Sequence, residues 1–205
     1  GAIGNVEAGE MEHQPARWST DACKEMRCRD PDAAEAMVNL VESQRMNLNS
    51  IGSRVDLIVT GTPLGLGEPW FDGIEPAMAR AMMSIPAARG VTFGRGFDVV
   101  NMTGLEHNDA WGGSPESPTP LGERPDGVLA GLATSAPIRC SVAFKPPSSI
   151  ASEQKTLHLE SGAIEPLTVK GRHDPVLGPR AVAVVEAMAI LVLTDLALRG
   201  GFIDG

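Results

Sequence analysis

The chain has 205 residues, of which 42% are hydrophobic and 21% charged, a composition that allows one sizeable core or two small ones. Its net charge of -9 argues against a polyanion-binding surface, and a 4% aromatic content without tyrosine argues against platforms for stacked nucleic-acid bases. Between Arg139 and Arg180, however, six basic residues outnumber four acidic ones, so this segment carries +2 and the remainder -11. A basic segment in an acidic chain favours a small anionic ligand.

The cysteines and the hydropathy pattern bear on the compartment. Cys23, Cys28 and Cys140 are odd in number, which predicts a reducing environment and buried, inert thiols. Cys23 and Cys28 lack the CxxC spacing, and His13 nearby gives only a weak indication of zinc. No stretch holds about 18 uninterrupted apolar residues, the length of a membrane span, so we expect a cytoplasmic protein.

The first half of the chain predicts alternating helices and strands. A short strand is expected near Asn5–Ala8 within a polar, irregular start. Asp30-Pro31-Asp32 is a helix start, and apolar residues at helical spacing extend that helix to Asn47. Alternation predicts a strand over Ser53–Thr60, the Gly- and Pro-rich run 61–69 predicts a loop, and Glu75–Ile85 predicts an amphipathic helix.

The second half ends in a long apolar helix. The Pro-, Gly- and Ser-rich segment 111–127 is typical of a mobile loop, and Pro137–Phe144 predicts a strand. Strands are also expected at Lys155–Leu159 and Leu167–Lys170, around a turn at Ser161-Gly162. The last helix, Pro179–Arg199, is apolar on nearly every side, which predicts burial all round.

The stretch Lys170-Gly171-Arg172-His173-Asp174-Pro175 places cations, an imidazole and a carboxylate directly before that helix. Pro179 suits the first helical turn, where unpaired backbone donors attract anions. Arg172 and Arg180 add guanidinium forks that can bind phosphate or carboxylate in a bidentate manner. The alternative interpretation is an ordinary solvated basic surface.

This stretch, continued by PRAVAVVEAM at 179–188, resembles the C-terminal signature of chorismate synthase, a flavin-dependent family of the shikimate pathway. The opening Gly1-Ala2-Ile3 is similar to a mid-chain string of that family, so more than a third of the usual enzyme is expected to precede residue 1. Further segments carry the likeness in the family's order: Cys28–Pro31, Gly65–Asp72 (GLGEPWFD), Ser84–Ala87, Gly90–Phe97, Glu106–Asp109 and Lys145–Ile150.

The resemblance implies an α+β fold, a β-α-β sandwich with helices packed between antiparallel sheets, a single domain over residues 1–205, and a homotetramer. It implies a lyase that uses reduced FMN to convert 5-enolpyruvylshikimate-3-phosphate to chorismate and phosphate, in aromatic amino acid biosynthesis. The substrate is thus a small anion, and neither nucleic acid nor a membrane is an expected partner. The alternative is a silent or incomplete family member that acts as a flavin- or anion-binding or structural module.

The resemblance also implies roles for individual residues. Asp174 would be the proton-relay carboxylate, ionised beside Arg172, and His173 an orienting group; the rival interpretation of Asp174 is a salt bridge to Arg172 without a catalytic part. Arg180 and His107 would bind substrate, and no metal site is expected. The flavin contacts would be Pro86, Ala87, Ala130, Lys145, Pro146, Pro147, Ser148, Ser149 and Arg172.

Two departures from the family accompany this likeness. The family's Thr-Asn-Asn-Ala-Gly-Gly run corresponds to Gly122–Gly127 here, and a companion Gly-Gly becomes Ala130-Gly131. The family's two proton-donor histidines and its Arg-Ser-Ser flavin segment have no counterpart in these 205 residues. Both departures affect groups that shape the substrate and flavin pocket in the family.

Overall fold

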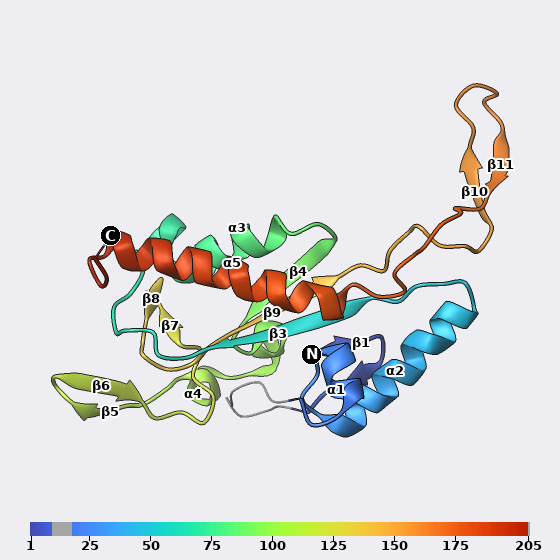
Figure 1. The fold of residues 1–205 in the computed structure, drawn as a ribbon. Helices are drawn as coiled ribbons and strands as arrows, with labels where there is room; N and C mark the ends of the chain where they lie inside the picture. The colour runs from blue at the N-terminus through green and yellow to red at the C-terminus, as the bar shows by residue number, and fades with distance from the viewer. Residues whose placement is uncertain (10–17, 205) are drawn as a thin grey trace. The chain divides into compact units, whose positions relative to one another are not determined.

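The computed structural model describes residues 1–9 and 18–204. They form two compact units: unit 1 contains Gly1–Arg54 and Ala143–Val182, and unit 2 contains Val55–Val142 and Ala183–Gly205. Helices and antiparallel strand pairs occur in both units (Figure 1). The predicted α+β class is therefore confirmed.

Three elements begin in one unit and end in the other. They are β3 (Ser53–Val59), β9 (Ile138–Phe144) and α5 (Gly178–Arg199). The main sheet has five strands in the order β2-β1-β3-β9-β4. The strands predicted at Ser53–Thr60 and Pro137–Phe144 are confirmed as β3 and β9.

Unit 1 begins with a small hairpin followed by two helices. Both strands of this hairpin run antiparallel to each other, and β1 also pairs with the start of β3 through Ala2 and Arg54. The strand predicted near Asn5–Ala8 is one arm of this hairpin. The elements are β1 (Ala2–Ile3), β2 (Val6–Glu7), α1 (Asp21–Met26) and α2 (Pro31–Met46).

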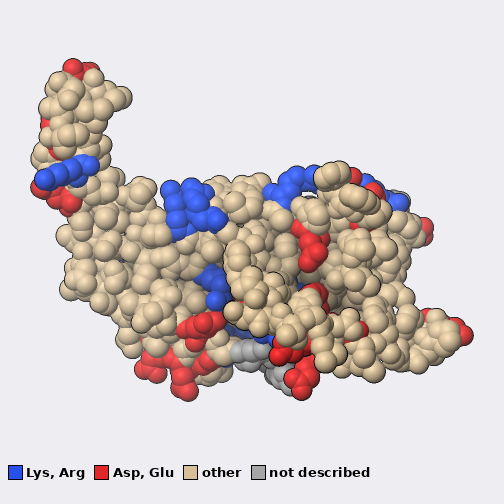
Figure 2. Space-filling model, turned by 180° about the vertical axis from the view of Figure 1, so that it is seen from behind, with Lys and Arg blue, Asp and Glu red and all other residues tan. Residues whose placement is uncertain are grey.

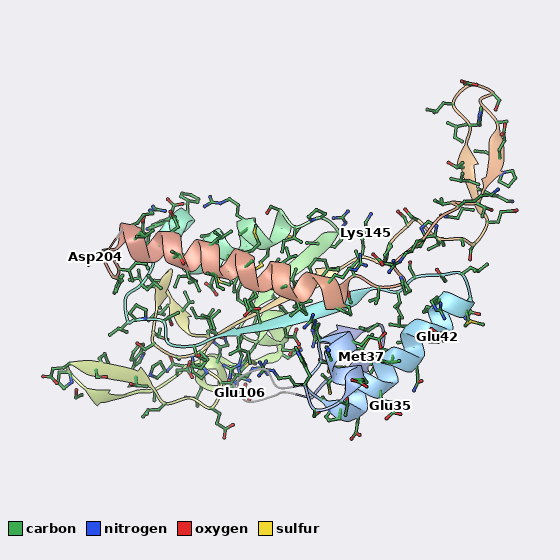
Figure 3. All side chains as sticks on the ribbon, viewed as in Figure 1. Glu35, Met37, Glu42, Glu106, Lys145 and Asp204 are labelled. Carbon is green, nitrogen blue, oxygen red and sulfur yellow. The ribbon has the colours of Figure 1, made fainter. Side chains whose placement is uncertain are left out.

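The predicted start of α2 is confirmed in detail. Asp30 is the N-cap and accepts a hydrogen bond from the Ala33 amide at 3.0 Å, while Pro31 occupies the first turn. Met37 is buried in a cluster with residues of α1 and β1, and Figure 3 shows it on the opposite side of α2 from Glu35 and Glu42. This amphipathic arrangement holds the helix on the core of unit 1.

A second hairpin in unit 1 projects before α5. β10 (Gln154–Leu157) pairs antiparallel with β11 (Ile164–Leu167). The hairpin was predicted, but its second strand was placed at Leu167–Lys170, three residues too late. The turn closes on itself earlier, because the Gly162 amide donates to the His158 carbonyl at 2.8 Å.

Unit 2 has its own core, made by α3, β9 and α5. Its most deeply buried side chains include Ile74, Met78, Met82, Val142 and Val185. The segment 111–127, predicted as a mobile loop, contains a hairpin, and its mobility stays a prediction. The other elements are the 3-10 helices η1 (Trp70–Asp72) and η2 (Gly96–Asn101), α3 (Ile74–Met83), β4 (Ala88–Phe93), α4 (Gly104–His107), β5 (Trp111–Ser114), β6 (Ser117–Pro120), β7 (Val128–Leu129) and β8 (Leu132–Ala133).

The GLGEPWFD loop of unit 2 has a packing role that its glycines make possible. A Cβ on Gly67 would lie 2.5 Å from the Gly131 carbonyl oxygen, and one on Gly73 would lie 2.8 Å from the Gly131 Cα. The loop is tied there by the Ile74 amide, which donates to the Gly131 carbonyl at 3.0 Å. Larger residues would separate these backbones.

The prediction that the last helix is buried on all sides is wrong. Val185, Ala189 and Leu196 of α5 are buried, but Ile190 and Leu191 are 58% and 64% exposed. Within the described residues, α5 alone is long and apolar enough to cross a membrane. The core helix of a protein outside a membrane can be equally long and apolar, but only 22% of the most apolar 18-residue stretch of α5 is buried.

Candidate functional site

The residues predicted to form the site fall into the two units. Pro86, Ala87, His107 and Ala130 belong to unit 2. The others belong to unit 1, where the loop after β9 and the loop before α5 carry them: Lys145, Pro146, Pro147, Ser148, Ser149, Arg172, His173, Asp174 and Arg180.

Asp174 is paired with Arg180 and not with Arg172. The Arg180 NH1 donates to Asp174 Oδ2 at 2.6 Å, across the turn that leads into α5. The predicted pairing with Arg172 is therefore wrong, because the first turn of α5 brings Arg180 back toward the loop. With one oxygen held in this way, the other oxygen of Asp174 remains able to accept a proton or a hydrogen bond.

His173 is held by the backbone. Its Nε2 lies 2.9 Å from the Val169 carbonyl oxygen. Because a carbonyl only accepts, this contact assigns the proton of the neutral imidazole to Nε2 and leaves Nδ1 as an acceptor. The side chain is half-buried, so the ring has a defined orientation beside Asp174.

The loop after β9 offers donors suited to a phosphate. Lys145, whose position is labelled in Figure 3, is exposed, as are Ser148 and Ser149. Within the described residues, neither Lys145 nor Arg172 forms an ion pair. The Ile150 amide donates to the Ser148 carbonyl at 3.1 Å and closes a tight turn. A cation and two hydroxyls on one tight turn are groups that can bind a phosphate.

A pocket of about 150 Å³ adjoins this loop and includes residues that sequence reasoning missed. Arg45, Leu48 and Asn49 were not among the predicted site residues. No local pattern could have found them, because they precede the site loops by about a hundred residues. The pocket is lined by Arg45, Leu48, Asn49, Ile150, Ala151, His173, Asp174 and Pro175.

In unit 2, two of the predicted flavin contacts have unusual backbones. Ala87 and Ala130 have φ angles of 71° and 53°, in the left-handed region that non-glycine residues rarely adopt. Such conformations persist where the surroundings impose them, often at ligand sites. Pro86 precedes Ala87 in the turn between α3 and β4.

His107 of unit 2 lies beside an acidic group. Its Nε2 is 3.3 Å from Asp126 Oδ2, and both side chains are about one-third exposed. Burial, followed by the charge of Asp126, raises the pKa of the Glu75 carboxyl. His107 therefore belongs to a small titratable cluster and has a partner before any substrate arrives.

The remaining predictions concern the surface charge, the cysteines and a metal site. On the face shown in Figure 2, Lys and Arg side chains are interspersed with Asp and Glu. The three cysteines are free and buried, as predicted. Residues 1–9 and 18–204 contain no group of three or more His, Cys, Asp or Glu side chains that could hold a metal ion. His13 lies outside the described residues.

Comparison with known proteins identifies the family. The chorismate synthase family profile matches residues 2–198. The chorismate synthase of Methanosarcina barkeri is 42% identical over 179 residues, covering 87% of this chain and 49% of that protein. The Aeropyrum pernix enzyme is 45% identical over 176 residues, covering 84% of this chain and 46% of its own.

A solved structure agrees with these relatives. A crystal structure of chorismate synthase superposes with a TM-score of 0.67 at 26% identity, over 85% of this chain and 45% of that one. The chain thus has a chorismate synthase fold, and it belongs to the chorismate synthase family. It spans about half the length of the curated relatives that it matches.

Proposed function

We propose that this chain forms a chorismate synthase site around Asp174. The reaction is the conversion of 5-enolpyruvylshikimate-3-phosphate to chorismate and phosphate in the cytoplasm, by a homotetramer that uses reduced FMN. The observation that carries the proposal is Asp174, which is paired with Arg180 at 2.6 Å and lines the pocket together with His173. Family membership supports the reaction class.

The charges of the site suit the substrate. Its two carboxylates and its phosphate require cationic donors, and the loss of phosphate builds up negative charge that such donors stabilise. Among residues 1–9 and 18–204, Arg172 and Lys145 form no ion pair, and Arg180 uses one of its five donors on Asp174. These groups bind and orient the anion before the C–O bond breaks.

Asp174 is the proposed proton acceptor of the site. Arg180 orients the carboxylate through the hydrogen bond to Oδ2, which leaves the other oxygen able to accept a proton. His173, with Nε2 held by Val169, presents Nδ1 to accept a hydrogen bond from a ligand or a water molecule. When bound, reduced flavin supplies the electron density for C–O cleavage that no side chain provides.

A second candidate function is a flavin- or anion-binding module without turnover. The observation that favours it is that Lys145 and Arg172 form no ion pair among the described residues, so both are available to an anion. In this case the same cations bind FMN, but no chorismate forms without a further polypeptide.

Chorismate formation under anaerobic conditions, with chemically reduced FMN and the enolpyruvyl substrate, tests the enzyme proposal. We expect turnover by the chain, and a loss of about 100-fold or more in Asp174→Asn, whose amide oxygen still accepts from Arg180. The matched control is Glu160→Gln, an exposed hairpin residue, which should leave the rate unchanged.

Binding separates the two candidate functions. FMN binding by fluorescence titration without turnover supports the module. Turnover that Asp174→Asn leaves intact refutes the role of Asp174, and the absence of both binding and turnover refutes both candidates for this chain.

A further inference from the structure

The last turn of α2 and the residues that follow it form a wall of the Asp174 pocket, through Arg45, Leu48 and Asn49. The opposite walls come from residues 150–151 and 173–175. The family likeness assigned nothing to this end of α2. The geometry of this end of α2 points to a ligand-binding role for one of these three residues.

Hydrogen bonds attach this wall to both site loops. Ser152 donates through Oγ to the Leu48 carbonyl at 2.9 Å, and the Ser50 Oγ donates to the Pro147 carbonyl at 2.5 Å. The Ile51 amide donates to the Pro175 carbonyl at 2.8 Å. The relative positions of the three walls are therefore set before a ligand binds, which lowers the ordering cost of binding.

Arg45 is the cation of this wall. Its Nε donates to Glu42 Oε2 at 2.8 Å and its NH2 to Glu42 Oε1 at 2.6 Å, so one edge of the guanidinium is held in a bidentate pair. NH1 and the second hydrogen of NH2 remain available, because the group has five donors. Figure 3 shows Glu42 on the outer side of α2, near its C-terminal end.

We propose that Arg45 binds an oxyanion of the pocket's ligand, a carboxylate or phosphate, with its remaining donors, and that Glu42 positions it. This inference rests on the proposed function for the identity of the ligand, and it adds a cation that lines the same pocket as Asp174. The pocket's volume of about 150 Å³ accommodates one six-membered ring beside the charged groups. The oxyanion belongs either to the flavin phosphate or to the substrate.

Glu42 has two opposing effects on such a ligand. Its carboxylate fixes the guanidinium, and its negative charge opposes an incoming anion. Gln at this position keeps an acceptor oxygen for Arg45 but removes the charge. Glu42→Gln and Arg45→Gln should therefore change anion affinity in opposite directions.

The test measures dissociation constants of the full chain by fluorescence titration for FMN, by calorimetry for the enolpyruvyl substrate, and by thermal shift for inorganic phosphate. We expect Arg45→Gln to weaken the binding of one of these anions about 5- to 20-fold, and Glu42→Gln to tighten it about 2- to 5-fold. Lys155→Gln removes the same charge from the exposed β10 strand and should have no effect. Circular dichroism melts check that each variant is folded.

Comparing the FMN titration with the calorimetry of the enolpyruvyl substrate identifies the source of the oxyanion. Equal affinities in Arg45→Gln and Lys155→Gln for all three anions overturn the inference, as does weaker binding in Glu42→Gln. An effect on phosphate alone, without FMN or substrate binding by the parent chain, supports the Arg45 site and refutes the proposed function. FMN or substrate binding that is indifferent to Arg45 refutes the site and leaves the function standing. Binding of none of the anions refutes both.

Discussion

Two leucines of α5 allow its one-sided burial to be tested with the same chemical change. Leu196 is 2% exposed in the core of unit 2, and Leu191, on the same helix, is 64% exposed. Leu196→Ala removes buried methyl groups and leaves a cavity, for which about 2–5 kcal/mol of unfolding free energy is lost. Leu191→Ala removes a side chain that is only about one-third buried, so it should cost about 0.5–1 kcal/mol.

The assay is urea unfolding followed by circular dichroism at 222 nm, at several protein concentrations. We expect the midpoint of Leu196→Ala to fall well below that of the parent and the midpoint of Leu191→Ala to stay close to it. Helix propensity does not confuse the comparison, since both variants carry the same replacement. A loss above about 2 kcal/mol in Leu191→Ala, comparable with that in Leu196→Ala, would falsify the exposure of this face.

Three further predictions concern the cap of α2, a buried thiol and the strained loop of unit 2. Asp30→Ala should cost about 1 kcal/mol at pH 7. Because amide hydrogen bonds, first from Ala33, lower the pKa of this carboxyl, the stabilisation is fully present above the unfolded pKa of about 4 and is lost as the pH falls through the lowered pKa, so the urea midpoints of the variant and the parent should approach each other as the pH is lowered below about 4. Burial, with the charge of Asp56, raises the pKa of the Cys140 thiol to about 12, so iodoacetamide at pH 8 should label it only as fast as unit 2 opens, and rapid labelling in the folded chain would contradict this. Ala130→Gly should raise the unfolding free energy by about 0.5–1 kcal/mol by relieving a positive φ, whereas Gly131→Ala, whose Cβ would lie 2.3 Å from the Glu68 carbonyl oxygen, should lower the melting temperature; the opposite order would show that the loop conformation is wrong.

Local signals in the sequence predicted the local structure well. Asp30-Pro31 marks the start of α2, and the glycines and prolines of 61–69 mark a loop, because capping and turn chemistry act over a few residues. The short helices α1 and α4 were missed although their caps are in the sequence. Thr103 and Glu106 form a capping box for α4, but four residues are too few for a visible apolar period.

Tertiary relations could not be predicted in the same way. Burial of α5 on all sides was predicted from its apolar composition alone. Composition does not determine which face of a helix packs against another segment. The pairing of Asp174 with Arg180 instead of Arg172 depends on the path of the turn between them. Arg45 enters the site through contacts about a hundred residues away in sequence, which no local pattern encodes.

The hydrogen bonds that join residues 48 and 50 to residues 147 and 152 also bear on the order of folding. These contacts are separated by 97 and 104 positions, and the whole of the first stretch of unit 2 lies between them. During synthesis, residues 1–54 must wait for the loop after β9 and for Val176, a member of their buried cluster, before their unit can close. The residues 55–142 emerge as an insertion within an unfinished unit, so loop-closure entropy opposes the assembly of unit 1 until the last quarter of the chain is made.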